Sequence, residues 1–408
     1  AGGSPGIASG LTELNPDIFC IANPMWVVTG GGTEATSSSN TDSKDVTVLK
    51  NVRTALNKIY TPDNDSYTGP NYIDLMLTDV TTLPTYNNDG AFQSYKQLRN
   101  IELPAVTDIE EYAFYKCESL TTASMPKATS IENFAFAGCK ALTTVSMPQI
   151  TSIGRYAFNN CDALKTASML LTETLGESAF QNCKILTTAN MPIANSIGGY
   201  AFSGCSTLAT VNMPMATSIG SGAFSACYAL TKVSMPKVTS IGNYGFSGCN
   251  ALTTASMPQA TSIGNDAFNN CKALTTVNIL QATSIGNRAF SDCKTLTTAS
   301  MPQATSIGSG AFYGCIALQS LDISSVTKIE KLGTDYGSMF FPAFDNSTDP
   351  ETFKNCDLLL NSALKQYCYD TDGTSQNGPL VNLKIPTKIN SSDETDSYTF
   401  TFRSITFK

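Results

Sequence analysis

The sequence contains no histidine in 408 residues. Histidine is the commonest general acid or base near neutral pH and the commonest metal ligand, so its absence argues against an enzyme or a metal site without excluding either. Charged residues are also scarce, at 14% with a net charge of -8. A charge-poor, mildly acidic chain lacks the basic surface that binding to DNA, RNA or an anionic membrane requires.

Long apolar segments and a starting methionine are missing as well. No apolar run reaches the roughly 18 residues that a membrane-spanning helix needs, so we expect no transmembrane segment. The start at Ala1 is compatible with removal of a signal peptide or of a lipoprotein leader, which would provide a lipid anchor, and equally with an artificial boundary. No phosphate-binding loop, nucleophile elbow or catalytic triad is present. We therefore predict a protein that is not an enzyme and holds no cofactor or metal.

The main feature that is present is a repeat of 22 residues. Cysteine follows three residues after each repeated phenylalanine from Cys117 to Cys315, and leucine follows three residues after that. Self-similarity at such a period predicts a solenoid of stacked units, here eleven of them. The repeated phenylalanines are Phe92, Phe114, Phe136, Phe158, Phe180, Phe202, Phe224, Phe246, Phe268, Phe290 and Phe312.

The first half of each unit predicts a short strand. Leu142, Val145 and Met147 follow the L-x-x-L-x-L spacing of a leucine-rich repeat. The alternation directs Val145 and Met147 inward and Ser146 outward. Pro148 then ends the strand because it lacks the N–H group that a central ladder needs. Stacked units place these strands in one parallel sheet on one face of the solenoid.

The second half of each unit returns the chain. Ile153 is expected to fill the core from the second side, and Gly154 to adopt a positive φ in a turn. Residues 155–160 predict a short helical or 3-10 turn, with Ala157 and Phe158 facing the core. The fold class expected from the whole unit is therefore an α/β-type leucine-rich-repeat solenoid.

Both ends depart from the repeat, as the caps of a solenoid must. Apolar spacing within residues 43–60 predicts an amphipathic helix that caps the first unit, and residues 72–77 an extra strand. Phe353 to Leu359 restores the repeat spacing, and residues 398–402 alternate as a strand. The predicted domains are an N-terminal extension with a helical cap (1–89), the repeats (90–330), and an irregular last repeat with a β-rich C-terminal cap (331–408).

Ten of the 13 cysteines occupy one position of the repeat. A cysteine at the same place in every unit suits a small apolar side chain in a narrow part of the core, and we expect free, buried thiols. Disulfides between neighbouring units and metal binding are the alternatives, but no C-x-x-C pair and no histidine support a zinc site. Cys20 and Cys368 lie outside this column, and the sequence assigns them no role.

Two kinds of outward position are candidates for binding. The strands present small polar residues, such as Thr144 and Ser146, which favour either a solubilising surface or a hydrogen-bonding platform. The position after the strand-ending proline is Lys or Gln in most repeats, but the three successive repeats that break this rule carry Leu171, Ile193 and Met215. Leu170 also replaces the proline there. Exposed, these four residues would be an apolar partner-binding site; the alternative is that the next turn half-buries them.

The consensus Leu-x-x-Val/Ala-x-Met-Pro, Thr-Ser-Ile-Gly and Ala-Phe-x-x-Cys-x-x-Leu resembles the BspA-like leucine-rich repeats over residues 90–330. The resemblance implies a surface or secreted protein of anaerobic bacteria, similar to adhesins that bind host matrix proteins or other microbes. It supplies no catalytic residues. We therefore expect a non-enzymatic, extracellular or cell-surface binding protein whose ligand is a protein or a glycan. The alternative is a structural spacer or envelope scaffold without a specific ligand.

Overall fold

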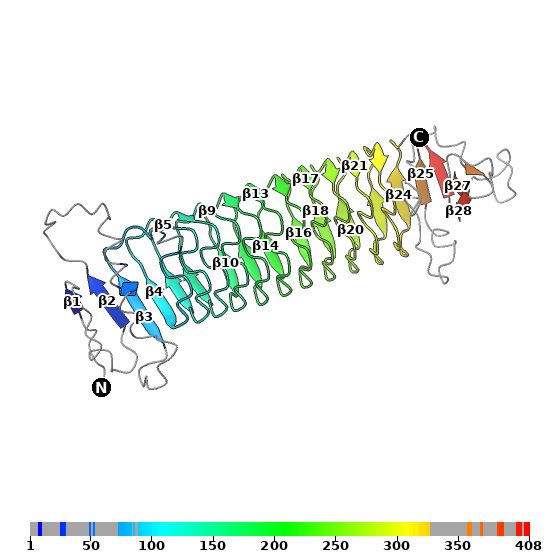
Figure 1. Cartoon of the computed structure of the whole chain (residues 1–408). Coiled ribbons are helices and arrows are strands. Elements are labelled where there is room, and N and C mark those ends of the chain that lie inside the picture. Colours follow the sequence, from blue (N-terminus) through cyan, green and yellow to red (C-terminus); the bar gives the residue numbers. More distant parts are fainter. Residues whose placement is uncertain are drawn as a thin grey trace. The chain divides into compact units, whose positions relative to one another are not determined.

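The computed structural model describes residues 7–9, 25–29, 49, 52–53, 72–83, 85, 89–326, 357–360, 368–369, 382–386, 397–401 and 404–408. The chain divides into two compact units, Ala1–Met191 and Pro192–Lys408, each of which is described by itself. In both, successive turns of the chain coil into a solenoid of the leucine-rich-repeat type (Figure 1). The division at residues 89 and 330 remains a proposal.

In the first unit, every repeat contributes one strand to a parallel ladder, here called the first ladder. Most strands pair with the equivalent residues of the next repeat, for example Thr122 with Thr144 and Ser124 with Ser146. The ladder is interrupted once in this unit, because Thr144–Ser146 and Thr166–Ser168 belong to separate sheets. The strands are short because proline follows most of them. They are β4 (Leu98–Glu102), β6 (Thr122–Ser124), β8 (Thr144–Ser146), β10 (Thr166–Ser168) and β12 (Thr188–Asn190).

A second parallel ladder was not predicted. The Thr-Ser-Ile segment of each repeat forms a two-residue strand that pairs with the next one, as Ser130 pairs with Ser152 and Ile131 with Ile153. Ile153 lies in this ladder and is buried, as the sequence predicts. In the first unit the strands are β5 (Asp108–Ile109), β7 (Ser130–Ile131), β9 (Ser152–Ile153) and β11 (Thr174–Leu175).

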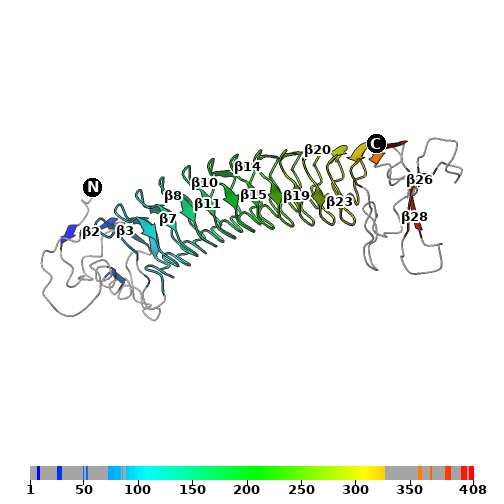
Figure 2. The same ribbon diagram turned by 90° about the horizontal axis from the view of Figure 1, so that it is seen from above.

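The second unit repeats both ladders. Seen from above, β15, β19 and β23 lie on a different side of the coil from β20 (Figure 2). The strands of the first ladder are β14 (Thr210–Asn212), β16 (Lys232–Ser234), β18 (Thr254–Ser256), β20 (Thr276–Asn278), β22 (Thr298–Ser300) and β24 (Ser320–Ile323). Strand β14 belongs to a separate sheet from β16 and the strands that follow it. The second comprises β13 (Ser196–Ile197), β15 (Ser218–Ile219), β17 (Ser240–Ile241), β19 (Ser262–Ile263), β21 (Ser284–Ile285) and β23 (Ser306–Ile307).

The return half of each repeat is a run of turns, so the predicted helical or 3-10 turn is wrong for the described repeats between residues 89 and 326. The N–H groups alternate between two kinds of acceptor. The N–H of Phe114 donates to Ala135 of the next repeat at 2.7 Å, whereas that of Tyr115 donates to Tyr112 three residues back at 3.0 Å. Residues in the left-handed region, such as Tyr112 (φ 58) and Lys116 (φ 57), make this alternation possible and interrupt any helix.

The prediction of a positive φ at Gly154 is also wrong, because the left-handed residue is Tyr156, two positions later. Glycine is required at 154 for a different reason. A Cβ atom there would lie 2.7 Å from the carbonyl carbon of Glu132 and 2.8 Å from the nitrogen of Asn133. The backbones of adjacent repeats approach too closely at this corner for any other residue.

The core is a stack of identical side chains. Every repeated phenylalanine from Phe92 to Phe312 is fully buried. Their rings stack nearly parallel, with centroids 5.0 to 5.5 Å apart in the first unit and 5.2 to 5.6 Å apart in the second. Ala157 and Phe158 face the core as predicted, whereas Val145 is only half-buried. Each stacked pair contributes about 0.5–1.5 kcal/mol beyond simple burial.

The N-terminal end is described in part. Leu49, Val52 and Arg53 have helical backbone, but the rest of residues 43–60 lies outside the described residues, so the predicted helical cap is not supported as an element. Strand β3 (Ile73–Leu77) is the predicted extra strand, and its register with β4 shifts between Ile73 and Asp74. Two further parallel strands precede it, β1 (Ile7–Ser9) and β2 (Met25–Thr29).

The C-terminal end contains strands where they were predicted. Strand β25 (Asp357–Leu360) pairs with β24 as a last repeat, and β29 (Ser404–Phe407) pairs with β25. Three antiparallel strands form a separate small sheet, which agrees with a β-rich cap. They are β26 (Cys368–Tyr369), β27 (Asn382–Pro386) and β28 (Ser397–Thr401).

Candidate functional site

All four residues of the predicted apolar site are exposed. Leu170 and Leu171, in the first unit, are 52% and 41% exposed. In the second unit Ile193 and Met215 are each 40% exposed, and their repeats are adjacent because β13 pairs with β15. Each of these side chains therefore has part of its surface in contact with solvent, and their role as a binding site stays a prediction. The polar residues at the same position are exposed too; they are Lys127, Gln149, Lys237, Gln259, Gln281 and Gln303.

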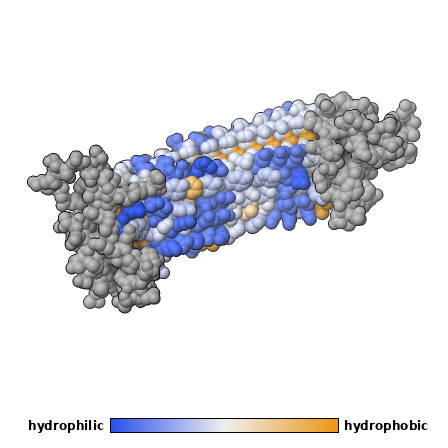
Figure 3. Space-filling view, viewed as in Figure 1, coloured by the Kyte–Doolittle hydropathy of each residue, from blue (hydrophilic) through white to orange (hydrophobic). Residues whose placement is uncertain are grey.

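The outward residues of the first ladder form a polar surface. Over β16, β18 and β20 the surface is mainly white to blue; orange forms a narrow band beside them, with isolated spots elsewhere on this face (Figure 3). Thr276 and Thr298 are exposed, and their hydroxyl groups make no hydrogen bond to another described residue. This leaves the predicted hydrogen-bonding platform available to a ligand, but it is equally a solvated surface.

A neighbouring threonine column has a structural role that the sequence reading missed. The hydroxyl of Thr253 donates to the carbonyl of Thr231 at 3.0 Å, and that of Thr275 to the carbonyl of Thr253 at 3.0 Å. The same bond links Thr143 to Thr121 at 3.0 Å in the first unit. Each such bond joins two repeats, which explains why threonine recurs there.

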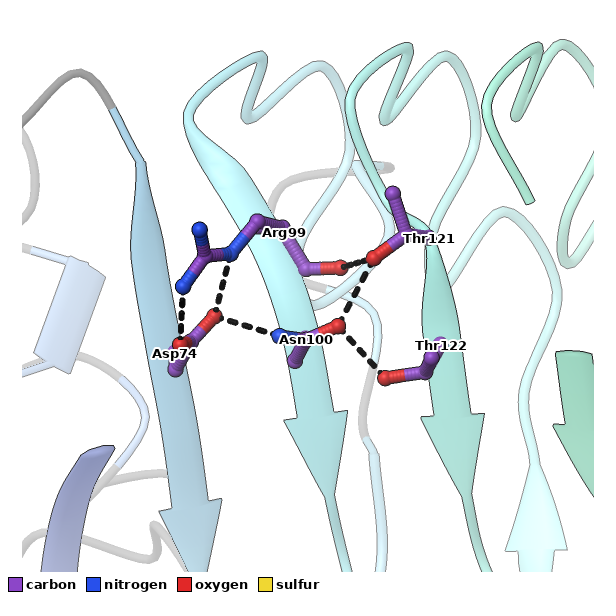
Figure 4. Close-up of polar contacts among 5 residues, drawn as sticks. All are labelled: Asp74, Arg99, Asn100, Thr121 and Thr122. Atoms are coloured by element: carbon purple, nitrogen blue, oxygen red, sulfur yellow. Dashed lines mark hydrogen bonds and ion pairs between the residues drawn. The ribbon is translucent and has the colours of Figure 1, made fainter. Parts of the chain in front are cut away.

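A polar cluster on the first strands of the repeats was also not predicted (Figure 4). Arg99 of β4 pairs with Asp74 of β3 through two hydrogen bonds of 2.9 and 2.5 Å. Asn100 donates to Asp74 at 2.7 Å and accepts from the hydroxyls of Thr121 and Thr122 at 2.7 and 2.6 Å. Hydrogen bonding to Asp74 raises the pKa of Arg99. The cluster links β3, β4 and β6. Its two charged groups, Arg99 and Asp74, are paired with each other, so the cluster fixes strand register rather than providing a free binding site.

An asparagine column holds the turns of the second unit together. The Oδ1 atom of Asn243 accepts from the N–H of Asn265 at 2.8 Å, and that of Asn265 from Asn287 at 2.8 Å. Asn133 receives the same bond from Arg155 at 2.9 Å in the first unit. The 22-residue spacing of these asparagines was a usable signal in the sequence.

Aromatic side chains gather on the turn side of the first unit. Tyr112, Phe134 and Tyr156 occupy one left-handed position in three successive repeats. Their rings stack, with centroids 5.1 Å apart for Tyr112 and Phe134 and 4.8 Å apart for Phe134 and Tyr156. Tyr115 contacts Tyr112 edge to face at 5.5 Å. The column is half-buried and its members are one another's partners.

The cysteine column is chemically inert. All ten of these cysteines are free and buried, and the thiol of Cys139, for example, lies 3.1 Å from the carbonyl oxygen of Phe114. Burial raises the pKa of Cys117 and Cys249 to about 12, so neither thiol is a nucleophile at neutral pH. The described part of the chain contains no group of three acidic, cysteine or histidine side chains arranged for a metal ion. Cys20 lies outside the described residues.

No helix among the described residues has the length and apolar character to cross a membrane. Among the described residues, the side chains with a raised or lowered pKa include a buried thiol, Cys117, and the carboxyl groups of Glu110 and Glu118.

Among solved structures, a leucine-rich repeat protein from Bacteroides ovatus is 22% identical, over 72% of this chain and 90% of that chain, with a TM-score of 0.38. A leucine rich cell surface protein from Faecalibacterium prausnitzii is 24% identical, over 64% of this chain and 84% of that one, with a TM-score of 0.35. For a leucine-rich repeat protein from Eubacterium ventriosum the identity is 17%, the coverage 80% and 95%, and the TM-score 0.39. No curated protein sequence matches the chain.

The sequence model described as BspA type leucine rich repeat region (6 copies) matches the chain in overlapping segments. They cover residues 85–209, 173–297, 217–335, 261–365 and 283–406. The match thus extends well beyond the regular repeats, into the C-terminal segment. Because it runs over most of the sequence, the protein belongs to the BspA-type leucine-rich repeat family.

Proposed function

We propose that this protein is a non-enzymatic binding protein at the cell surface or outside the cell, adhesin-like, which presents its repeats to a host or microbial macromolecule. The family and the fold support this proposal, since leucine-rich-repeat solenoids generally serve as protein-binding scaffolds and no catalytic family matches. The surface supports it too. It is rich in threonine, serine and asparagine and poor in charge, and it carries no cluster of reactive side chains among the described residues.

The observation that carries the proposal is the break in the column that follows the strand-ending proline. Leu171, Ile193 and Met215 are each about two-fifths exposed, at 41%, 40% and 40%, where six other repeats place lysine or glutamine. Exposed apolar patches mark partner-binding sites more often than scattered single apolar residues do. Leu170, at 52% exposed, adds to the apolar area in the first unit.

The test is the triple variant Leu171→Gln, Ile193→Gln and Met215→Gln, compared with the unaltered chain. Binding to a panel of immobilised extracellular-matrix proteins is measured by surface plasmon resonance. We expect a matrix protein to bind the unaltered chain, and the triple variant to bind it about tenfold or more weakly, as for the loss of central apolar contacts. Its free energy of unfolding should change little because the three side chains are exposed.

The matched control places conservative polar changes in the same column, Lys237→Gln, Gln259→Asn and Gln281→Asn, which should leave binding unchanged. Strong destabilisation of the triple glutamine variant would show that the apolar residues belong to the core. If no panel member binds and the chain instead assembles with itself, the spacer or envelope-scaffold function replaces the proposal.

A further inference from the structure

On the turn side of the second unit, the turn segments of three successive repeats contain no charged residue. These segments are residues 198–206, 220–228 and 242–250. The equivalent turn in the next repeat carries Asp266 and Lys272. The three uncharged turns contain three tyrosines. Their other exposed or half-buried residues are glycine, serine, asparagine and alanine. Tyrosine supplies rigid, amphipathic contact area, and serine, glycine and asparagine supply adaptable hydrogen bonds, so this composition is that of a binding surface.

The three tyrosines are among the most exposed large side chains of the described repeats. Tyr200 is 42% exposed, Tyr228 51% and Tyr244 48%. None of them stacks on another aromatic ring among the described residues. Tyr200 (φ 55) and Tyr244 (φ 58) are nevertheless held in the left-handed region, which a bulky residue occupies at a cost. A strained aromatic side chain that stacks on no other ring points to a role other than folding.

Hydrogen bonds between the repeats bring these residues together. The N–H of Tyr200 donates to the carbonyl of Ser221 at 2.8 Å, and the N–H of Gly222 to the carbonyl of Asn243 at 2.7 Å. Asn243 directly precedes Tyr244. The Cε1 atom of Tyr228 lies 3.9 Å from the point where a Cβ of Gly248 would stand, four residues beyond Tyr244. The three tyrosines therefore border one continuous surface.

Gly222 shapes this surface. Atoms Cε1 and Cδ1 of Tyr200 lie 2.5 and 2.6 Å from the place that a Cβ of residue 222 would occupy, so the ring rests on the glycine backbone. Gly222 is buried beneath it, with a φ of 63°. One face of the Tyr200 ring thus packs against the backbone of Gly222, and the rest of the flat ring is exposed to solvent.

We propose that the tyrosine surface, defined as Tyr200, Ser221, Tyr228, Asn243 and Tyr244, binds an uncharged glycan chain. The face of an aromatic ring is the negative part of its quadrupole, so it attracts the weakly positive C–H groups on the flat side of a sugar ring. The phenol hydroxyls, the hydroxyl of Ser221 and the amide of Asn243 meet the sugar hydroxyls. Tyr200 and Tyr244 are two repeats apart, roughly 10 Å at the spacing of paired strands, which accommodates more than one sugar ring.

The lack of charged residues in the three turns argues against charged ligands. A phosphate, sulfate or carboxylate group would lose its hydration here without meeting an opposite charge, because the three turns contain none. Asn243 is suited to a hydroxyl-rich partner, since its Oδ1 atom is occupied by the N–H of Asn265 at 2.8 Å and its Nδ2 group remains to donate. An arginine, which is enriched at the centres of protein interfaces, is also absent from the three turns.

This inference rests on the proposed binding function, but it concerns a different surface, so the two can fail separately. The experiment is affinity electrophoresis of the whole chain in native gels that contain mannan, dextran or a mixed-linkage β-glucan, with heparin as the charged comparison. We expect at least one neutral polysaccharide to retard the chain and heparin not to do so. The double variant Tyr200→Ser, Tyr244→Ser should bind about tenfold more weakly, as two lost ring contacts imply.

Three further variants make the result specific. Tyr200→Phe with Tyr244→Phe keeps both rings and should keep most of the affinity, whereas Tyr112→Ser with Tyr156→Ser alters the partnered rings of the first unit and should leave retardation unchanged. The triple glutamine variant at Leu171, Ile193 and Met215 should also be retarded normally.

The proposal is overturned if no neutral polysaccharide retards the chain, or if the serine double variant, shown to be folded by circular dichroism, is retarded as strongly as the unaltered protein. Binding to a proline-rich peptide without any polysaccharide binding would overturn it as well. Loss of matrix-protein binding alone would leave it intact and refute only the proposed function.

Discussion

The same turn position is built differently in the two units. In the first unit, the three aromatic residues Tyr112, Phe134 and Tyr156 stack on one another at 5.1 and 4.8 Å. In the second, the corresponding run is Tyr200, Gly222 and Tyr244: the middle ring is missing, and both tyrosines are more than two-fifths exposed, at 42% and 48%. The backbone is shared, because all six residues have a positive φ.

The comparison shows that the fold requires the left-handed backbone at this position but does not require an aromatic side chain there. The left-handed position is a property of the coil, since the N–H of each such residue donates to the next repeat, as Phe134 does to Arg155 at 2.9 Å and Gly222 to Asn243 at 2.7 Å. Glycine would satisfy it everywhere with less strain. Stacking contacts between rings offset the cost of the left-handed conformation in the first unit. The exposed rings of the second unit make no such stacking contacts. Exposed tyrosines at this position therefore mark a surface with a use outside the fold.

The largest expected effect tests whether the two units share one kind of core. Phe136→Ala in the first unit and Phe246→Ala in the second each remove a fully buried ring from the middle of the stack. Both should lower the free energy of unfolding by about 3–5 kcal/mol, because the cavity cannot close between two fixed rings. Guanidinium denaturation followed by circular dichroism measures this. A much smaller loss in one unit would mean that its repeats are held together mainly by backbone hydrogen bonds.

The thiols provide the second comparison. Burial raises the pKa of Cys117 and of Cys249 to about 12 from an ordinary value near 9.0, so the folded protein keeps both protonated. Because the folded-state pKa is the higher one, the stabilisation is complete below pH 9 and is lost as the pH rises towards 12. Each thiol then removes about 1.4 kcal/mol of unfolding free energy per pH unit.

Denaturation midpoints between pH 8 and 11 measure this loss, with Cys117→Ala and Cys249→Ala as single-site variants. Each substitution should make the decline with pH less steep by the contribution of one thiol. Native protein should also resist iodoacetamide at pH 8, and unfolded protein should react. A stability that is flat up to pH 11 would contradict the burial of these thiols.

Much of the fold could be predicted because the core residues recur at fixed positions of the repeat. Phenylalanine, cysteine and leucine at fixed positions identify the buried side chains, and the spacing of Leu142, Val145 and Met147 identifies the first ladder. The return half was misassigned for a physical reason. Phe136, Cys139 and Leu142 are three residues apart, and that interval suits both a 3-10 helix and a succession of three-residue turns. They are distinguished by every second N–H group, such as that of Phe136, which donates to the next repeat, here to the carbonyl of Ala157 at 2.8 Å.

The site was less accessible to sequence reasoning. Leu171, Ile193 and Met215, which the sequence singled out, are exposed, and their role in binding stays a prediction. The Asp74 and Arg99 pair could not be found, because Asp74 lies outside the repeat, where no spacing relates it to β4. Tyr200 and Tyr244 had a signal in their spacing of 44 residues, which is two repeats, whereas Tyr228 had none. That signal gained meaning only once the structure showed which rings have partners.

A smaller effect is expected at the tyrosines themselves. Tyr156→Gly removes a ring that is stacked on Phe134 at 4.8 Å, whereas Tyr244→Gly removes an unpartnered one. Both substitutions relieve left-handed strain of about 1–2 kcal/mol. We therefore expect Tyr156→Gly to be the more destabilising by about 1 kcal/mol, and Tyr244→Gly to be neutral or stabilising. Equal losses, measured by urea denaturation, would show that the exposed tyrosine also supports the fold.

The smallest effect concerns charge, which distinguishes the same two surfaces. The turns of the first unit carry pairs such as Glu118 with Lys140, whose charged atoms are 2.8 Å apart, where the second unit has uncharged residues such as Ser206 and Tyr228. The hydrogen bond from Lys140 lowers the pKa of Glu118, so this contact favours folding above the ordinary glutamate pKa and loses its effect as the pH falls. Lys140→Gln should return the pKa of Glu118 towards that ordinary value, which an NMR titration of its carboxyl carbon measures. Stability should barely change, because both side chains are solvated and an exposed pair contributes little. If the pKa of Glu118 does not rise in this variant, the pair does not form in solution, and charge on the first unit's turns serves only to keep that face hydrated.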